Sequence, residues 1–418
     1  MTLSAQTSVP SLARGRPGLL LATLMMGAMS ISLGFVVCMA SLPQIAQDFG
    51  SRGPFIAQMM ISTVALGLLV GAPVSGWILA RAGTRGTLIA SCILFGVSGA
   101  GGMVLDNPTL LLASRFLTGF AEVTLTTTCF WAIGTAYEQE RRPRVFGLAT
   151  TMGNATSIAG VMIGGVLAQV GGWRLSFVQL PVFAALTLLL GLISLRQVKP
   201  GNSGGGTEPR APFFKRLLPF YLLVALLFLI LFMASTQYVF LLQSDGIASP
   251  TLRSIFLSAY TLIGALTGLG YGAMQKRLSM TGTFALGLTC MAVALALLGW
   301  SANLAAAAAG TVLIGIYIGI IGTYVNHFVT EQTDAGSRGH ALGILMTFSY
   351  LGAFLNPPVL TPLGQWLGPR NVFLLAALIM AVIAAGTLTR LRLHRAEPLL
   401  AASPDSLPGQ QRNPPVPK

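Results

Sequence analysis

Charged side chains are scarce in this chain: only 9% of its 418 residues are charged, and only 11 are acidic. Soluble domains carry roughly 25% charged residues. Hydrophobic residues make up 54% of the sequence and gather in long runs, each close to the roughly 20 residues that cross a bilayer as a helix. The composition therefore excludes an ordinary soluble domain. It predicts an all-α integral membrane protein, surrounded by lipid, that crosses the membrane many times.

Cysteine and histidine are also rare, at four and three residues. No Cys-x-x-Cys pair and no Cys/His spacing typical of a metal site occurs, so we expect neither disulfides nor a bound metal. Gly96-Val97-Ser98-Gly99 resembles the Gly-x-Ser-Gly motif of intramembrane serine proteases, but no histidine is evidently placed to activate the serine. We therefore expect no catalytic residues, no enzymatic activity and no cofactor.

Basic residues outnumber acidic ones and give a net charge of +14. They form no patch interleaved with aromatic residues, so we expect no nucleic-acid partner. They fall instead at the ends of the apolar runs, as membrane topology requires. Twelve transmembrane helices are predicted, at residues 18–41, 54–79, 86–105, 110–137, 145–169, 175–195, 217–241, 253–274, 281–301, 304–328, 341–366 and 371–391.

With twelve spans, 20 of the 25 basic residues fall on the side of the two termini. Arg52, Arg174, Arg253 and Arg370 fall on the opposite side, and Arg115 alone lies inside a span. An excess of Lys and Arg marks the cytoplasmic side of a membrane protein. The count therefore predicts that both termini are cytoplasmic, with the protein in the plasma membrane, and we expect a bacterial inner membrane.

Composition also divides the chain into domains. Residues 196–216 are rich in glycine and charge and are predicted to be a cytoplasmic linker between two six-helix bundles, at residues 18–195 and 217–391. Cytoplasmic tails are predicted at residues 1–17 and 392–418, and the second is rich in Pro, Ser and Gln from Ala396 onward, which indicates disorder. The first apolar run is too long for the core of a signal peptide, so we expect a retained helix.

The two halves resemble each other in sequence. A shift of 196 residues, without gaps, aligns glycine and arginine positions at loops and helix ends. A constant offset across six helices predicts two pseudo-symmetric bundles, the architecture of transporters that rock two halves around a central site. The aligned pairs are Gly50 with Gly246, Gly76 with Gly272, Arg81 with Arg277, Arg142 with Arg338, Gly147 with Gly343, Gly172 with Gly368, Arg174 with Arg370 and Phe177 with Phe373.

Glu122 is the only acidic residue predicted to lie deep inside a span. A carboxylate there is costly unless it is paired, hydrated or protonated, so such residues are functional candidates. Burial disfavours the charged form, which suits a group that binds and releases protons. The alternative is a neutral carboxyl group held by a hydrogen bond across a helix interface. Arg115 lies seven residues earlier, roughly 10 Å along the axis, and either takes part in coupling or snorkels to the outer interface.

The end of the second span reads Gly76-Trp77-Ile78-Leu79-Ala80-Arg81-Ala82-Gly83-Thr84-Arg85. It resembles the signature G-x-L-a-D-R-x-G-R-[RK] of the major facilitator superfamily, and the second half keeps a glycine and basic residues at the corresponding loop. In the family, the acid of this signature helps to close the cytoplasmic side, and here Ala80 replaces it. The matching positions, expected to take part in gating, are Gly76, Arg81, Gly83 and Arg85, with Lys276 and Arg277 in the second half.

Two further stretches resemble signatures of the family. Arg115-Phe116-Leu117-Thr118-Gly119 resembles the fourth-helix signature R-x-x-x-G, which the superfamily associates with proton-coupled transport. The run from Gly160 to Gly165 resembles the exporter signature G-P-x-x-G-G, with Val161 in place of proline. Gly119, Gly160, Gly164 and Gly165 are accordingly expected to belong to the moving parts, and the last three also permit close helix packing.

The resemblance implies a cavity lined by helices one, four, seven and ten, with contributions from five, eight and eleven. Asn356-Pro357-Pro358 is expected to break helix eleven, with a simple kink as the alternative. Polar groups of these helices near mid-membrane, or in the outer half of helices seven and eight, are the candidate substrate contacts. They are Tyr317, Gln237, Asn154, Asn356, Tyr260 and Tyr238.

The resulting prediction is a monomeric secondary transporter that works by alternating access. We expect H+-coupled export of a small, largely apolar organic compound, with Glu122 and Arg115 in proton coupling and the proton gradient as the energy source. The alternative is an H+-coupled symporter that imports a nutrient or organic acid, with Arg115 contacting an anion. A remote alternative is a non-transporting receptor or an intramembrane enzyme.

Overall fold

A computed structural model of the chain describes residues 17–137, 141–196, 212–334 and 337–401. Most of the predicted linker at residues 196–216, the first sixteen residues and the end of the second tail lie outside the described residues. The described residues form helices and no β-strand. In the first half these are α1 (Pro17–Met29), η1 (Ser30–Ser32), α2 (Leu33–Val36), η2 (Met39–Ser41), α3 (Leu42–Asp48), η3 (Gly50–Arg52), α4 (Gly53–Val104), α5 (Pro108–Ala136), α6 (Arg142–Gly171), η4 (Trp173–Val178) and α7 (Gln179–Ser194).

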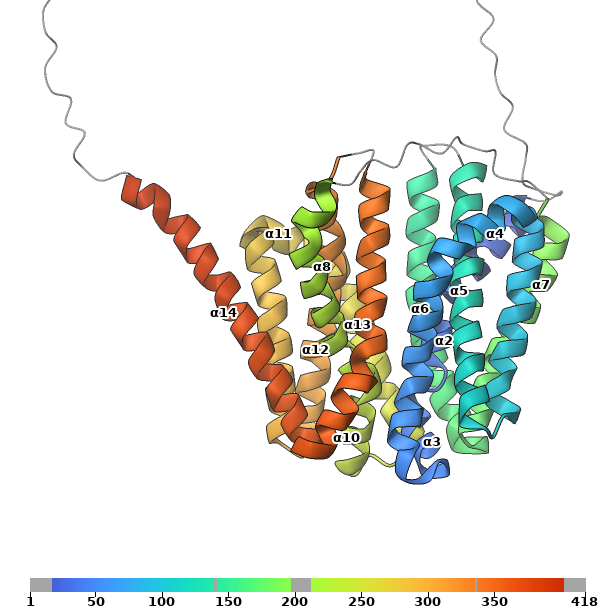
Figure 1. The fold of residues 1–418 in the computed structure, drawn as a ribbon, viewed down its shortest axis with the longest axis horizontal. Coiled ribbons are helices and arrows are strands. Elements are labelled where there is room, and N and C mark those ends of the chain that lie inside the picture. Colours follow the sequence, from blue (N-terminus) through green and yellow to red (C-terminus); the bar gives the residue numbers. More distant parts are fainter. Residues whose placement is uncertain (1–16, 138–140, 197–211, 335–336, 402–418) are drawn as a thin grey trace, which may run out of the picture.

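The helices of the second half stand beside those of the first (Figure 1). Residues up to 196 gather on one side of the molecule, and residues from 212 onward gather on the other. The second half contains α8 (Pro212–Leu231), α9 (Met233–Thr236), α10 (Tyr238–Ser244), α11 (Pro250–Trp300), α12 (Leu304–Glu331), α13 (Arg338–Leu367) and α14 (Pro369–Ala401).

Ten helical stretches of the described residues are long and apolar enough to cross a membrane. Two of them are far longer than one crossing needs: α4 has 52 residues and α11 has 51. At 1.5 Å per residue, a straight helix of that length would measure roughly 75 Å, more than twice the thickness of the hydrocarbon core. Each is interrupted by a residue with non-helical dihedral angles, Gly83 in α4 and Ser279 in α11. Figure 1 shows the chain reversing direction within α4.

Left-handed backbone conformations recur with the spacing of the sequence repeat. Six of the described residues have positive φ, and they form three pairs in which the partners are 196 residues apart. One pair, Gly83 and Ser279, contains the two interruptions and was not among the aligned positions of the sequence. The chain therefore turns at corresponding places in its two halves. The pairs are Gly50 with Gly246, Gly83 with Ser279, and Gly172 with Gly368.

Ser279 is the one described residue other than glycine with positive φ, at φ 64° and ψ 170°. This region costs a side chain about 1–3 kcal/mol. Its hydroxyl group compensates in part, because Ser279 Oγ accepts a hydrogen bond from the Gly282 amide at 3.3 Å and so caps the following helical segment. Replacing a serine cap with glycine costs only a few tenths of a kcal/mol.

Ser279→Gly is therefore expected to stabilise the protein by about 1 kcal/mol, since the relief of strain exceeds the lost cap. The midpoint of thermal unfolding in detergent measures this change. Ser279→Ala is the control, because it removes the cap and keeps the strain, and its midpoint should fall. A midpoint for Ser279→Gly at or below that of the unchanged protein would show that the turn carries no strain.

The molecule has two ends that differ in packing. We call the end formed by α3, η3 and the start of α11 the Asp48 end, and the end with the turns at Gly83 and Ser279 the Arg81 end. Between described residues, the hydrogen bonds that join the two halves all lie toward the Asp48 end. They include Ser249 to Gln169 at 2.5 Å and Ser258 to the Ile158 carbonyl at 3.3 Å.

The Arg81 end is more open. Trp77 is 55% exposed there, and a Cβ added to Gly147 or Gly343 would meet no atom within 4 Å. A hydrophobic cluster of the first half at this end, around Leu24 and Cys129, contains no residue of the second half among those described. The halves are thus hydrogen-bonded to each other toward the Asp48 end, which we call closed, and we call the less closely packed Arg81 end open.

The predicted break of helix eleven is wrong, because α13 continues from Arg338 to Leu367 through Pro357, Pro358 and Pro362. A proline lacks an N–H group, so Pro357 leaves the carbonyl of Ala353 without its helical donor. Ser62 of α4 supplies the missing hydrogen bond from its Oγ, at 3.1 Å. A side chain of the other half thus takes the place of the backbone donor, and the helix continues.

The Ser62–Ala353 hydrogen bond gives a testable coupling. Ser62→Ala should destabilise the protein by about 1 kcal/mol, because it leaves a buried carbonyl unpaired. In a Pro357→Ala background the new backbone N–H group can bond to Ala353, so the same serine change should cost close to nothing. A double-mutant cycle on unfolding midpoints measures the difference. Equal costs in the two backgrounds would refute the proposed substitution of donors.

The last helix is longer than the last apolar run. α14 continues to Ala401, ten residues beyond the predicted end of the span at residue 391. Residues 390–397 are rich in Arg, Leu, Ala and Glu, which are good helix formers. The first part of the predicted second tail, up to Ala401, is therefore helical rather than disordered.

Candidate functional site

Glu122 lies in α5 and is completely buried. Its Oε2 accepts a hydrogen bond from the backbone amide of Gly34 at 3.2 Å, whereas its Oε1 is buried with no hydrogen-bond partner among the described residues. A buried polar atom without a partner is rare and calls for an explanation such as a proton, a water molecule or a ligand. The carboxyl group is thus held by one oxygen and unsatisfied at the other.

The first span is irregular at the place where it meets Glu122. Two short 3-10 segments, η1 and η2, interrupt it on either side of α2. The interruption directs the Gly34 amide toward α5, so it bonds to a side chain of another helix. The approach is close, because a Cβ on Gly34 would lie 2.3 Å from Glu122 Oε2. A larger residue at position 34 would therefore displace the Glu122 carboxyl group.

Arg115 is also completely buried and lies in α5, on the N-terminal side of Glu122. Its Nη2 donates to the carbonyls of Ser98 and Gly99 in α4, at 3.1 and 3.2 Å, and its guanidinium carbon lies 4.6 Å from the centre of the Phe177 ring. Nε and Nη1 have no partner among the described residues. The side chain is thus directed into the first half and does not snorkel to an interface. Within the described part of the chain, no direct ion pair joins it to Glu122.

The surroundings of Glu122 extend into the second half. The hydroxyl groups of Thr124, Thr126 and Thr128 bond to carbonyls of α5 itself. Tyr350 of α13 is close enough to Glu122 to interact with it electrostatically. The acid therefore lies in the first half with a tyrosine of the second half nearby.

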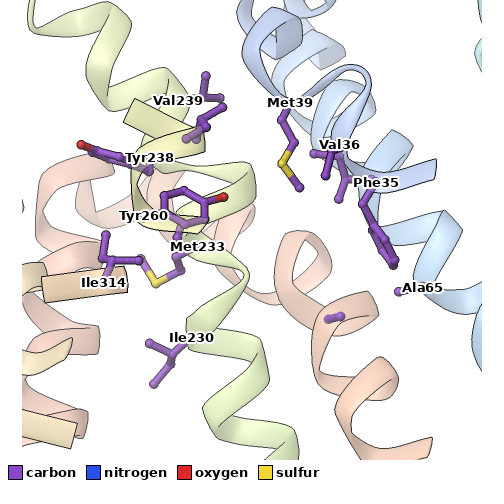
Figure 2. Packing of buried hydrophobic residues seen from close by; sticks show 14 of the residues in the cluster. Phe35, Val36, Met39, Ala65, Ile230, Met233, Tyr238, Val239, Tyr260 and Ile314 are labelled. Atoms are coloured by element: carbon purple, nitrogen blue, oxygen red, sulfur yellow. The ribbon is translucent and has the colours of Figure 1, made fainter. Parts of the chain in front are cut away.

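Apolar and aromatic residues of both halves meet in one hydrophobic cluster. Figure 2 shows Phe35 and Met39 of the first half on one side and Tyr260 on the other, with the Tyr260 hydroxyl group directed toward the first half. The rings of Phe35 and Phe232 contact edge to face across the halves, 5.8 Å between centroids. This surface between the halves suits an apolar or aromatic molecule.

The predicted substrate contacts do not form one group. Tyr317 and Tyr238 are buried inside the second half, where their hydroxyl groups bond to the carbonyls of Leu227 and Ala307. Asn154 is exposed on α6. Tyr260 lies 3.4 Å from the Ser235 hydroxyl group. A role for these residues in substrate binding stays a prediction.

Gln237 and Asn356 belong to a polar network whose centre the sequence did not reveal. Gln58 Oε1 accepts from Thr361 Oγ1 at 2.7 Å and from Gln237 Nε2 at 3.2 Å. The network continues through Thr236, whose Oγ1 is 2.7 Å from both Gln237 Oε1 and Asn356 Oδ1. It connects α4 of the first half with helices of the second, so Gln58 is a central residue of the closed Asp48 end.

The glycines of the exporter-like run pack closely, as expected. A Cβ on Gly164 would lie 2.4 Å from the Val37 carbonyl oxygen, and one on Gly165 would lie 2.5 Å from Ser254 of the second half. A Cβ on Gly160 would lie 2.9 Å from Val36. The run thus brings α6 against the first span and against α11.

The signature loop lies at the open Arg81 end. Gly76 has free space around it, and Gly83 forms the turn with φ 72°. The guanidinium carbon of Arg81 lies 4.0 Å from the centre of the Trp77 ring, and Arg85 donates to the Leu192 carbonyl at 3.2 Å. Lys276 and Arg277 are exposed at the corresponding place in the second half. The basic residues of the two halves therefore lie at the Arg81 end.

The chain matches the Major Facilitator Superfamily over residues 24–357 and again over residues 245–415. It is 24% identical to the Multidrug resistance protein 1 of Bacillus subtilis (strain 168). The aligned 241 residues are 56% of this chain and 61% of that protein. It is 26% identical to the Efflux pump radE of Floropilus chiversii. The aligned 164 residues are 38% of this chain and 30% of that protein. The chain thus spans less than two thirds of the length of either relative.

The fold is similar to that in the crystal structure of nucleoside transporter NupG. The TM-score is 0.70 at 14% sequence identity, and the match covers 89% of this chain and 98% of that chain. Identity this low establishes a common fold and nothing about the substrate. Because the family match extends over more than half of the sequence, this chain belongs to the major facilitator superfamily.

Proposed function

We propose that this protein is an H+-coupled exporter of a small, largely apolar organic compound, with Glu122 as the group that carries the proton. The observation that carries this proposal is the buried carboxyl group of Glu122, which is bonded to Gly34 at one oxygen and, among the described residues, unpartnered at the other. A full negative charge in such a place would need a partner. A proton on the Glu122 carboxyl group neutralises this charge. Release of the proton then changes the charge between the two halves.

The architecture that we propose has twelve membrane crossings in two six-helix bundles, at residues 18–195 and 217–391. Counting α4 and α11 as two crossings each, at their turns, gives this number. The 196-residue spacing of the left-handed turns supports the two-bundle arrangement. The bundles rock about the cavity between them, and this structure, with its open Arg81 end, is one of the two states.

The proposed cycle assigns one event to each state. With the Asp48 end open, a proton enters and neutralises Glu122. With the Arg81 end open, Glu122 releases the proton as substrate binds from that side. We place the Arg81 end in the cytoplasm, in the plasma membrane, because 20 of the 25 basic residues fall on that side in the twelve-span topology. Substrate then leaves at the Asp48 end.

The substrate class follows from the surface between the halves. Phe35, Phe232 and Tyr260 supply aromatic groups there, and Glu122 supplies a buried carboxyl group. Pockets of this kind suit compounds with a large apolar part and few polar groups. The relatives named as an efflux pump and a multidrug resistance protein support export of such compounds.

Inverted membrane vesicles containing the full chain test the direction and the coupling. A panel of apolar dyes and drugs is presented outside, and a proton gradient with the acid side inside is applied. Export predicts accumulation of at least one compound, and loss of that accumulation when a protonophore is added. Accumulation in right-side-out vesicles with the acid side outside would instead favour the symporter, the alternative function. Growth of a deletion strain on the same panel narrows the compounds beforehand.

A further inference from the structure

A separate cavity lies at the closed Asp48 end. Its volume is about 250 Å³, and it is lined by α4 of the first half and by α10, α13 and α14 of the second. Three of its lining residues, Pro54, Ser244 and Pro369, lie at or near helix ends. Gln58 lies in its wall, whereas neither Glu122 nor Gly34 does, so the cavity is distinct from the site around Glu122.

The walls of this cavity specify the chemistry of a ligand. No charged side chain of the described residues lines it, whereas Phe240 and Phe373 contribute aromatic rings. A charged ligand would lose its hydration there without gaining a counter-charge. A neutral molecule with an aromatic or other apolar body suits these walls.

Gln58 supplies a specific polar contact. Its Oε1 already accepts from Thr361 and Gln237, but its Nε2 donates no hydrogen bond among the described residues. The amide group is fixed in orientation by the two donors, so its Nε2 is held ready to donate. The complementary ligand therefore carries a carbonyl or hydroxyl oxygen.

The cavity exists only while the Asp48 end is closed, because its walls come from both halves. Rocking of the halves separates Gln58 of α4 from Thr361 of α13 and takes the cavity apart. A ligand that binds one state only shifts the population toward that state. Occupancy would therefore oppose opening of the Asp48 end.

We propose that this cavity is a second ligand site, for a small neutral molecule with an apolar ring and a carbonyl or hydroxyl acceptor, whose binding holds the Asp48 end closed. The site depends on the cavity between the halves and on the oriented Gln58 amide. Binding of a ligand to this second site does not depend on the proposed direction of transport or on proton coupling at Glu122.

N-benzylacetamide is a suitable probe, because it combines an aromatic ring with a carbonyl acceptor, and benzylammonium is its charged counterpart. Opening of the Asp48 end is measured by hydrogen–deuterium exchange of the full chain in lipid nanodiscs. The exchange rates of residues 53–62 and 238–248 report on it. At about ten times its dissociation constant, the probe should slow exchange there about tenfold, since only the closed state binds it. Benzylammonium should have no effect.

Variants that fill the cavity provide the matched test. Gly364 lies in its wall, and an added Cβ would be 3.7 Å from Val372, so Gly364→Leu places a side chain in the space. Ser244→Phe fills it from an exposed position and serves if the first variant does not fold. Either variant should slow exchange without the probe and abolish the response to it. Gly386→Leu, in open space on α14, should respond like the unchanged protein.

Three results would overturn the proposal. These are unchanged exchange with N-benzylacetamide, an equal effect of benzylammonium, or a probe effect that persists in both filling variants. None of them concerns transport. Failure of this site therefore leaves the exporter proposal intact, and failure of export in vesicles leaves the site intact.

Discussion

Glu122→Gln is expected to reduce proton-driven transport to the level of vesicles without protein, while the fold is kept. Glutamine has nearly the same shape as glutamic acid, and its side-chain oxygen can accept the hydrogen bond from the Gly34 amide that Glu122 Oε2 accepts at 3.2 Å. It cannot bind and release a proton in the cycle. The amide is neutral in both states, so the halves can rock with or without bound substrate, and neither movement is linked to a proton.

Two assays distinguish the loss of coupling from loss of the protein. Gradient-driven accumulation should disappear in Glu122→Gln, whereas counterflow of labelled substrate without a gradient should persist. Glu331→Gln is the control, because Glu331 is exposed and pairs with His327 one turn earlier, at 3.1 Å. Its accumulation should match that of the unchanged protein. Full proton-driven accumulation by Glu122→Gln would exclude Glu122 as the proton carrier.

Gly119→Ala is expected to destabilise the protein by about 3 kcal/mol, although it adds only one methyl group. A Cβ at position 119 would lie 2.1 Å from the Val64 carbonyl oxygen and 2.9 Å from its carbonyl carbon. Both are backbone atoms, so no flexible side chain can move aside. The helices α4 and α5 must separate to relieve the overlap, and the packing along their contact is lost with them.

The same substitution elsewhere in α5 gives the reference. A Cβ on Gly134 would meet no atom within 4 Å, so Gly134→Ala should raise stability by about 0.5–1 kcal/mol through helix propensity. The two variants have the same change in composition. We expect Gly119→Ala to be recovered in low yield, with a lower unfolding midpoint, and Gly134→Ala to behave normally. Similar midpoints for both would mean that α4 and α5 are less closely packed than the structure shows.

The sequence was most informative where one residue contrasts with its surroundings. Glu122 and Arg115 were selected because a charge in an apolar run is unusual, and both are completely buried in the structure. Their partners could not be predicted. Gly34 and the carbonyls of Ser98 and Gly99 act through backbone atoms, and no side-chain type marks a backbone group as a ligand.

Residues that join the two halves were the least predictable. Gln58 follows the start of an apolar helix and looks, in the sequence, like an interfacial amide. Its role depends on Thr361, 303 residues later. The continuity of α13 through Pro357 likewise depends on Ser62, 291 residues before its acceptor. Local sequence indicates the need for a donor but not the helix that provides it.

The bond between Ser62 and the Ala353 carbonyl also bears on which way the empty transporter faces at rest. When the Asp48 end opens, α4 leaves α13, and Pro357 cannot restore the lost donor. The opposite movement has no such cost at this carbonyl. The bond therefore biases the unloaded protein toward the state in which the Arg81 end is open. In an exporter, this is the state that binds substrate from the cytoplasm.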